Sequence, residues 1–288
     1  MRDAPSRTAE AVCFMRASDQ RRQPGQRILD DPQAKRFLGP LLRATLKTMK
    51  VGRRITDQAE AFSPGLLAYI LTRHRCIDDA LTESLPQGVD QLVLLGAGYD
   101  TRPWRFAKAL EHTRVFAVDH PSTGRRKAKV IAKHPVDFPD VGVVPVAIDF
   151  QTHSLKTRLL EAGFQPGKRT FVVWEGVSMY LTRDAVKETL ETMHVLSGPG
   201  SELMMDFWYM VDAPNLVSTL LRMSPHLLHF VGEPVTFGIH PDDVEAFLGR
   251  LGYETVDIAI ASELERRYVR DGRRVYPASY VVKMRVPS

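Results

Sequence analysis

The stretch LVLLGAGYDTRPW at residues 92–104 constrains the fold of this chain more than any other. Its four aliphatic residues predict a buried strand, and the Gly96-Ala97-Gly98 turn that follows has little side chain, so the backbone can approach a ligand closely. From residue 91 onward, short β-branched runs alternate with stretches of helical period. This alternation predicts an α/β fold, with a mostly parallel sheet and helices on both of its faces.

Seven apolar runs predict the strands of this sheet. They span residues 91–96, 114–119, 143–148, 170–175, 201–208, 253–260 and 278–286. Only 17 residues separate the last two runs, which favours a closing antiparallel pair. Thr182 is expected to cap a helix that reaches about Leu196, and His240 opens a helix that is expected to stop at Gly252.

Two segments lie outside the alternation of strands and helices. Residues 1–90 show helical periodicity and no strand pattern, which predicts an N-terminal helical cap before a catalytic α/β domain at 91–288. An insertion at 209–239, rich in Leu, Met, His and Pro, is predicted to form a helical lid. Because ligands of such sheets bind beyond the carboxyl ends of the strands, we expect both segments to fold over that edge.

Composition excludes several classes of protein. The chain has 288 residues and 44% hydrophobic content, enough for one large core. No apolar run approaches the ~20 residues that span a bilayer, and no signal core begins the chain, so we expect a soluble cytoplasmic protein. The net charge of +5 comes from scattered basic pairs, which predicts no nucleic-acid surface. Two cysteines, Cys13 and Cys76, give no disulfide framework, and no cluster has metal-ligand spacing.

The glycine turn could serve a dinucleotide or S-adenosylmethionine. Gly96, Gly98 and Asp119 fit a dinucleotide fingerprint, but Thr101 stands where the third glycine would be. Asp100 would also bring a carboxylate toward the pyrophosphate. S-adenosylmethionine has an ammonium and a sulfonium and no phosphate, so it favours close backbone approach and nearby anions. The sequence therefore favours S-adenosylmethionine, with an NAD(P)-dependent oxidoreductase as the alternative.

The ends of the second and third predicted strands carry further candidates for this pocket. Asp119 can accept hydrogen bonds from both ribose hydroxyls. Asp149 can bind the adenine amino group, while the Phe150 N–H donates to a ring nitrogen. Three successive strand ends would thus supply three parts of one pocket.

Several ordered motifs resemble the leucine carboxyl methyltransferase-like family of S-adenosylmethionine-dependent O-methyltransferases. They are RILDDPQAKRFL (27–38), RHRCIDD (73–79), LGAGYDTRPWR (95–105), VFAVDHP (115–121), IDF (148–150) and WEGVSMYLT (174–182). The resemblance runs from about residue 8 to residue 200, and within the family it is closer to the bacterial polyketide-tailoring branch than to the eukaryotic phosphatase-modifying enzymes. It implies a Rossmann-like class I methyltransferase fold.

The resemblance also implies roles for individual residues. Arg73 would bind the cofactor carboxylate, and Glu175 would face the methionyl ammonium or the substrate. Tyr180 would border the transferable methyl group, so Glu175 and Tyr180 are the catalytic candidates. The other expected cofactor contacts are Gly96, Ala97, Gly98, Asp119, His120, Asp149 and Phe150.

Some of these residues have structural alternatives. Arg73 could instead pair with Asp78 or Asp79 on one helix face. Asp100 could anchor its own turn or contact a ligand. We interpret Arg102 as a surface charge at a helix start, with a second clamp on the cofactor as the alternative. The histidines in or beside the insertion are more often surface or core residues than bases, and Tyr180 could equally serve packing.

The sequence predicts O-methylation of a carboxylate or phenol on a small hydrophobic acceptor, polyketide-derived or aromatic. A carboxylic acid is already ionised at pH 7, whereas a phenol must lose a proton, and no committed base is evident. The apolar run LVSTLLRMSPHLLHF at 216–230 favours a hydrophobic acceptor. A tRNA- or protein-carboxyl methyltransferase of the same family and a non-catalytic binding protein are the remaining alternatives. Monomer and homodimer both stay open.

Overall fold

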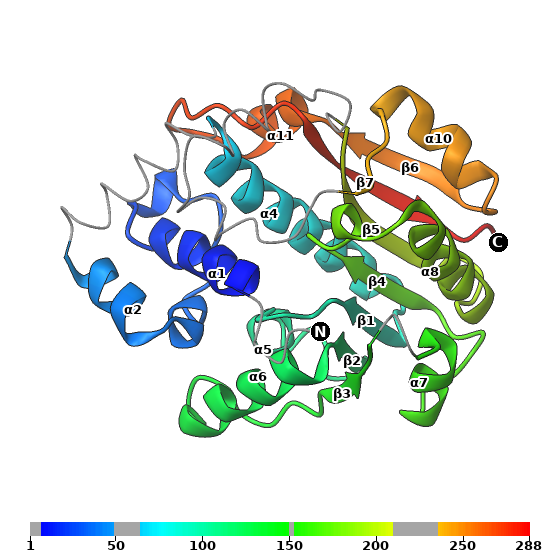
Figure 1. The fold of residues 1–288 in the computed structure, drawn as a ribbon, viewed down its shortest axis with the longest axis horizontal. Helices are drawn as coiled ribbons and strands as arrows, with labels where there is room; N and C mark the ends of the chain where they lie inside the picture. The colour runs from blue at the N-terminus through cyan, green and yellow to red at the C-terminus, as the bar shows by residue number, and fades with distance from the viewer. Residues whose placement is uncertain (1–6, 49–63, 150–152, 210–235) are drawn as a thin grey trace.

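A computed structural model describes residues 7–48, 64–149, 153–209 and 236–288 of the chain (Figure 1). Its centre is one sheet of seven strands in the order β3-β2-β1-β4-β5-β7-β6. The strands are β1 (Gln91–Leu95), β2 (Arg114–Asp119), β3 (Val144–Ala147), β4 (Thr170–Trp174), β5 (Glu202–Trp208), β6 (Glu254–Ala259) and β7 (Ser279–Arg285). All seven predicted strands are confirmed, each to within one residue at either end.

The direction of the strands also agrees with the prediction of a mostly parallel sheet. Strands β1 to β5 are parallel, and β7 runs antiparallel between β5 and β6. The closing antiparallel pair is therefore confirmed, although helix α11 (Ala261–Tyr268) lies in the connection between its strands. The strand order reverses between β1 and β4, the position where a doubly wound sheet opens a crevice for a ligand.

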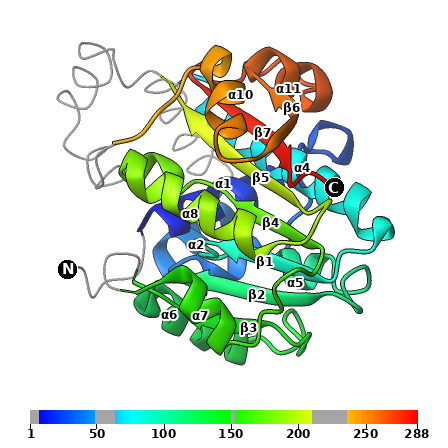
Figure 2. The same ribbon diagram turned by 90° about the vertical axis from the view of Figure 1, so that its right-hand side faces the viewer.

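Helices cover both faces of the sheet, as expected, and Figure 2 shows the strands stacked between them. On one face, α4 (Leu66–Ser84) and α11 pack on a core that contains Leu92, Leu94 and Met204. On the other face, α7 (Leu155–Glu161), α8 (Arg183–Leu196) and α10 (Pro241–Gly249) pack on the opposite side chains of the same strands. The alternation of burial along each strand thus divides the core into two layers.

The N-terminal region is helical in the part that the structure describes. It contains α1 (Arg7–Asp19), η1 (Pro24–Gln26), η2 (Ala34–Phe37), α2 (Pro40–Lys47), α4 and η3 (Leu85–Gln87), and no strand occurs in 7–48 or 64–90. Phe14 and Phe37 pack with Tyr99 and Phe138 in a separate small core. Helix α6 (Pro121–Lys133) lies against η2, so the N-terminal helices reach the part of the sheet where β1 and β2 end.

The predicted helix caps are present. Thr182 Oγ1 accepts from the Ala185 N–H (3.2 Å), and α8 ends at Leu196 as expected. His240 Nδ1 accepts from the Asp242 N–H (3.3 Å), but α10 ends at Gly249, before the predicted stop. Most of the predicted lid, residues 210–235 with its apolar run, lies outside the described residues, as does Phe150.

Candidate functional site

The register of the sheet brings four positions to one level at its carboxyl edge. Leu95 pairs with Val118 and Trp174, and Trp174 pairs with Met205. The residues that directly follow these four strand positions therefore form a row. That row consists of Gly96, Asp119, Glu175 and Asp206. Two of its three carboxylates were predicted as site residues. Asp206 was missed because it lies inside the apolar run ELMMDFWYM, although it is fully buried.

The glycine turn has the backbone conformation that its sequence predicts. Gly96 (φ +67°) and Gly98 (φ +39°) both lie in the left-handed region that favours glycine. A Cβ on Gly96 would collide with the Val177 side chain, whereas one on Gly98 would make ordinary contacts with the Ala9 Cβ at 3.5 Å and the Gly96 carbonyl oxygen at 3.7 Å. The Ala97 N–H donates to the Val118 carbonyl (2.9 Å), which ties the turn to β2.

Asp119 binds the glycine turn directly. Its Oδ2 accepts from the Gly98 N–H (2.5 Å) and its Oδ1 from the His120 N–H (2.6 Å). Burial raises the pKa of this carboxyl, and the two N–H groups and Lys127 partly offset the rise. Each carboxylate oxygen has a second lone pair, so Asp119 can still accept hydrogen bonds from the predicted ribose hydroxyls.

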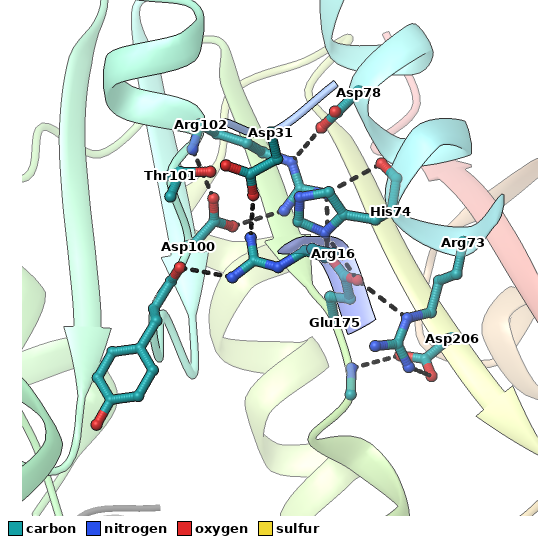
Figure 3. Close-up of polar contacts among 12 residues, drawn as sticks. Arg16, Asp31, Arg73, His74, Asp78, Asp100, Thr101, Arg102, Glu175 and Asp206 are labelled. Carbon is teal, nitrogen blue, oxygen red and sulfur yellow. Dashed lines mark hydrogen bonds and ion pairs between the residues drawn. The ribbon is translucent and has the colours of Figure 1, made fainter. Parts of the chain in front are cut away.

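Arg73 on α4 is 4% exposed and points at the carboxyl edge (Figure 3). Its Nε donates to Glu175 Oε1 (3.0 Å) and its Nη1 to Asp206 Oδ2 (2.7 Å). Asp206 Oδ1 in turn accepts from the Gly176 N–H (2.6 Å). Arg73 therefore makes neither of the alternative helix-face pairs, since Asp79 pairs with Arg75.

The second terminal nitrogen of Arg73 is left accessible by a glycine. Gly176 has φ +70°, and a Cβ there would lie 3.1 Å from Arg73 Nη2. The Arg73 hydrogen bonds to Glu175 and Asp206 use Nε and Nη1, and its guanidinium also lies 5.5 Å from the centre of the Tyr69 ring. A buried cation with a donor next to a bare glycine suits a carboxylate ligand, so the residues fit the carboxylate of S-adenosylmethionine.

The prediction that Arg102 is a surface charge is wrong, because its side chain is fully buried. Asp100 accepts from the Arg102 N–H (2.8 Å) and Nη1 (2.5 Å), and this turn folds the guanidinium back under the sheet edge. Arg102 Nε then donates to Asp78 (2.7 Å), and Nη2 donates to Glu175 Oε2 (2.9 Å). The turn-anchoring interpretation of Asp100 is thus confirmed.

His74 is a second member of the site that sequence reasoning missed. It is 3% exposed, with Nδ1 2.9 Å from Glu175 Oε2 and Nε2 3.0 Å from Arg105 Nη2. Burial and the charge of Arg102 lower the pKa of His74, so we assign the neutral ring, with Nδ1–H donating and Nε2 accepting. Arg105 also donates to Asp78 (2.6 Å) and closes the network.

Glu175 lies at the centre of these contacts and receives donors from Arg73, His74 and Arg102 (Figure 3). Burial alone would raise the pKa of its carboxyl. The interactions of Glu175 with His74, Arg102 and Arg73 outweigh burial and hold that pKa well below its usual range. Glu175 is therefore an ionised and engaged carboxylate, which makes it a weak base.

The remaining candidates lie around this edge. Tyr180 is half-buried and ends η4 (Ser178–Tyr180), directly after the Glu175 segment. His120 caps α6 by accepting from the Ser122 N–H (3.3 Å). Asp149 is half-buried after β3. Within the described ranges, no group of three His, Cys, Asp or Glu side chains could hold a metal ion, and no helix is long and apolar enough to cross a membrane.

The family model described as leucine carboxyl methyltransferase matches residues 9–194, about two thirds of the chain, including the glycine turn, Asp119 and Glu175. This chain belongs to the leucine carboxyl methyltransferase family. Two curated relatives share the name "Putative S-adenosyl-L-methionine-dependent methyltransferase". The one from Parafrankia sp. (strain EAN1pec) is 30% identical over 90% of this chain and 81% of the relative. The one from Frankia alni is 30% identical over 89% and 86%.

Solved structures show the same fold as this member of the leucine carboxyl methyltransferase family. A protein from Thermobifida fusca YX, described as a putative methyltransferase, aligns with a TM-score of 0.60 at 16% identity over 99% of this chain and 96% of that one. A DUF574 family protein from Streptomyces avermitilis aligns with a TM-score of 0.59 at 17% identity over 82% and 91%. The predicted class I methyltransferase fold is confirmed.

Membership in the leucine carboxyl methyltransferase family confirms the resemblance carried by the sequence motifs. The curated relatives are named for S-adenosyl-L-methionine, the cofactor that the glycine turn and its acids predict. The NAD(P)-dependent alternative finds no support among these relatives. The residue roles, and the polyketide-tailoring branch, stay predictions.

Proposed function

We propose that this chain is an S-adenosyl-L-methionine-dependent O-methyltransferase whose acceptor is a carboxylate on a small hydrophobic molecule, with a phenol of the same kind as second choice. The family and the glycine turn support methyl transfer from this cofactor. The choice of a carboxylate rests on one observation: Glu175 and His74 hydrogen-bond to each other and to arginines.

These hydrogen bonds decide whether Glu175 or His74 can remove a proton from the acceptor. A phenol has a pKa near ~10 and must lose its proton before it attacks, at a cost of roughly 4 kcal/mol at pH 7. Glu175 is held ionised by three donors, and both ring nitrogens of His74 are occupied. Neither is poised to take a proton, whereas a carboxylate acceptor needs none removed.

The chain's own residues then supply binding and alignment. Arg73 would pair with the cofactor carboxylate through Nη2, Asp119 would hold the ribose hydroxyls, and Asp149 the adenine. When bound, S-adenosylmethionine supplies an electrophilic methyl group on its sulfonium. Glu175 and Asp206 lie at the same edge of the sheet, where Arg73 and Arg102 pair with them. Tyr180, directly after this edge, would border the reacting methyl.

A matched set of acceptors tests the proposal. Aromatic acids, the phenols of the same ring systems, a peptide with a free carboxyl terminus and a tRNA would each be incubated with methyl-labelled cofactor between pH 6 and pH 9. We expect the acids to be methylated at a rate that varies little over this range. Methylation of phenols alone, with a rate that rises with pH, would show that the acceptor is a phenol, our second choice. Methylation of the peptide or the tRNA alone would refute it.

A further inference from the structure

Lys127 on α6 is buried to 7% exposure, whereas Lys129 and Lys133 on the same helix are exposed. Its Nζ donates to the Ala97 carbonyl at 3.4 Å and lies 5.8 Å from the centre of the Trp104 ring. Burying an ammonium is costly unless nearby charges or acceptors compensate. The position of Lys127 behind the glycine turn therefore calls for a compensating group.

The compensating group is Asp119, which binds the opposite end of the peptide that Lys127 contacts. The Ala97 carbonyl and the Gly98 N–H belong to the same peptide group. Lys127 donates to the carbonyl, and Asp119 Oδ2 accepts from the N–H at 2.5 Å. The Asp100 N–H donates to the same carbonyl at 2.8 Å. A rotation of this peptide would break all three contacts, so together they fix its orientation.

Lys127 and Asp119 also interact through their charges. Burial lowers the pKa of Lys127, and the charges of Asp100 and Asp119 oppose that change. Lys127 in turn lowers the pKa of Asp119, which burial has raised. His120 and Tyr99 also interact with Asp119, and on α1 Cys13 and Arg16 interact with Lys127.

We propose that Lys127 is a positioning residue for cofactor binding, which fixes the Ala97–Gly98 peptide and keeps Asp119 ionised. The part that concerns the cofactor rests on the proposed function. An ionised Asp119 can accept from two ribose hydroxyls, whereas a protonated one offers fewer lone pairs and a competing donor. Loss of the Lys127 charge should therefore move the acid limit of cofactor binding to higher pH.

Three substitutions separate the charge of Lys127 from its hydrogen bond. Lys127→Gln keeps a donor without the charge, Lys127→Met keeps neither, and Lys127→Arg keeps both. Lys129→Met, an exposed lysine on the same helix, is the control. The carboxyl carbon of Asp119 would be titrated by NMR, with Asp119→Asn to assign its signal. Cofactor affinity would be measured by calorimetry between pH 5 and pH 8.

We expect the Asp119 carboxyl to titrate at higher pH in the Gln and Met variants and at the unchanged pH in the Arg and control variants. A pKa increase of about one unit gives a loss of affinity of about tenfold at low pH, with recovery as pH rises. An equal loss at every pH, or an unshifted Asp119 titration in a folded Gln variant, would overturn the inference. Wild-type protein that binds no S-adenosylmethionine would contradict the proposed function instead, and the NMR titration would still decide the role of Lys127.

Discussion

Arg102 Nη2 lies 2.9 Å from Glu175 Oε2, and this contact joins the turn after β1 to the segment after β4. Asp78 and Asp100 accept from the remaining nitrogens of the same guanidinium, so α4 is connected to both. The residues come from distant parts of the chain and meet below the carboxyl edge. Folding this chain therefore assembles a charged centre at the carboxyl edge of the sheet.

Arg102→Met should destabilise the protein by about 3–5 kcal/mol, because it leaves Glu175, Asp78 and Asp100 buried without their shared cation. Arg102→Lys should recover only part of this, since one ammonium cannot reach three carboxylates in the geometry of a guanidinium. Urea unfolding of both variants measures the effect. The exposed Arg250→Met is the control, and stability equal to the control would show that the network contributes nothing.

The pH dependence of stability should follow the carboxylates of this network. The pKa values of Glu175 and Asp78 are held low, although burial alone would raise them. Groups with depressed pKa values stabilise the fold above their unfolded pKa of about 4, and this contribution is lost as pH falls further. We expect the free energy of unfolding to fall below about pH 5, and to fall less steeply in Glu175→Gln. Exposed Glu188→Gln should leave the slope unchanged.

Asp119→Ala should weaken binding of S-adenosylmethionine by more than tenfold, because each hydrogen bond to a charged acceptor contributes roughly 1.5–3 kcal/mol. Titration calorimetry measures the dissociation constant. Asp140 is the matched control, since it is an exposed acid that also accepts from a glycine N–H, 3.0 Å from Gly142. An unchanged dissociation constant in folded Asp119→Ala would remove this residue from the pocket.

Arg73→Ala should reduce affinity for S-adenosylmethionine more than affinity for an analogue without the amino-acid carboxylate. The reason is that Arg73 Nη2 can pair with that carboxylate, while its other nitrogens hold Glu175 and Asp206. Arg75→Ala, an exposed arginine on the same helix, controls for the loss of charge. Equal losses for both ligands would assign Arg73 a purely structural role.

Gly176→Ala tests whether the missing side chain at Gly176 keeps Arg73 Nη2 free to bind the cofactor. A Cβ at this position would lie 3.1 Å from Arg73 Nη2, and φ is +70°, so the variant combines strain with a blocked nitrogen. Gly88 has φ +90° with nothing within 4 Å of its Cβ position, so Gly88→Ala carries a similar strain alone. We expect both to lower the melting temperature and only Gly176→Ala to weaken cofactor binding. Equal cofactor affinity in the two variants would contradict the assignment of Arg73 Nη2 to the cofactor carboxylate.

The strands and the glycine turn could be predicted because their signals are local. Each strand is a short apolar run, and the absence of a side chain allows the positive φ values of Gly96 and Gly98. The network could not be predicted in the same way, because periodicity says nothing about which charges meet. Arg102 follows a turn and looks like a helix-start charge, yet its own bond to Asp100 redirects it inward.

A physical signal for part of the network was nevertheless present in the sequence. Asp206 lies among Met and Phe residues in β5, and a carboxylate in a buried strand needs a cationic or hydrogen-bonding partner. Arg73 is that partner, at 2.7 Å. A lone acid within an apolar strand would thus have pointed to Asp206, whereas the neutral ring of His74 depends on contacts that only the fold brings together.

The position of β7 has a consequence for how the protein can be made. This strand is last in the chain, yet it pairs with β5 on one side and β6 on the other. During synthesis, β6 would leave the ribosome before its only neighbour in the sheet exists, and β5 would keep an unpaired edge. Exposed edges of this kind invite wrong pairing between chains. Completion of the sheet must therefore await residues 279–285, so shortening the C-terminal strand should produce aggregates in place of a smaller folded enzyme.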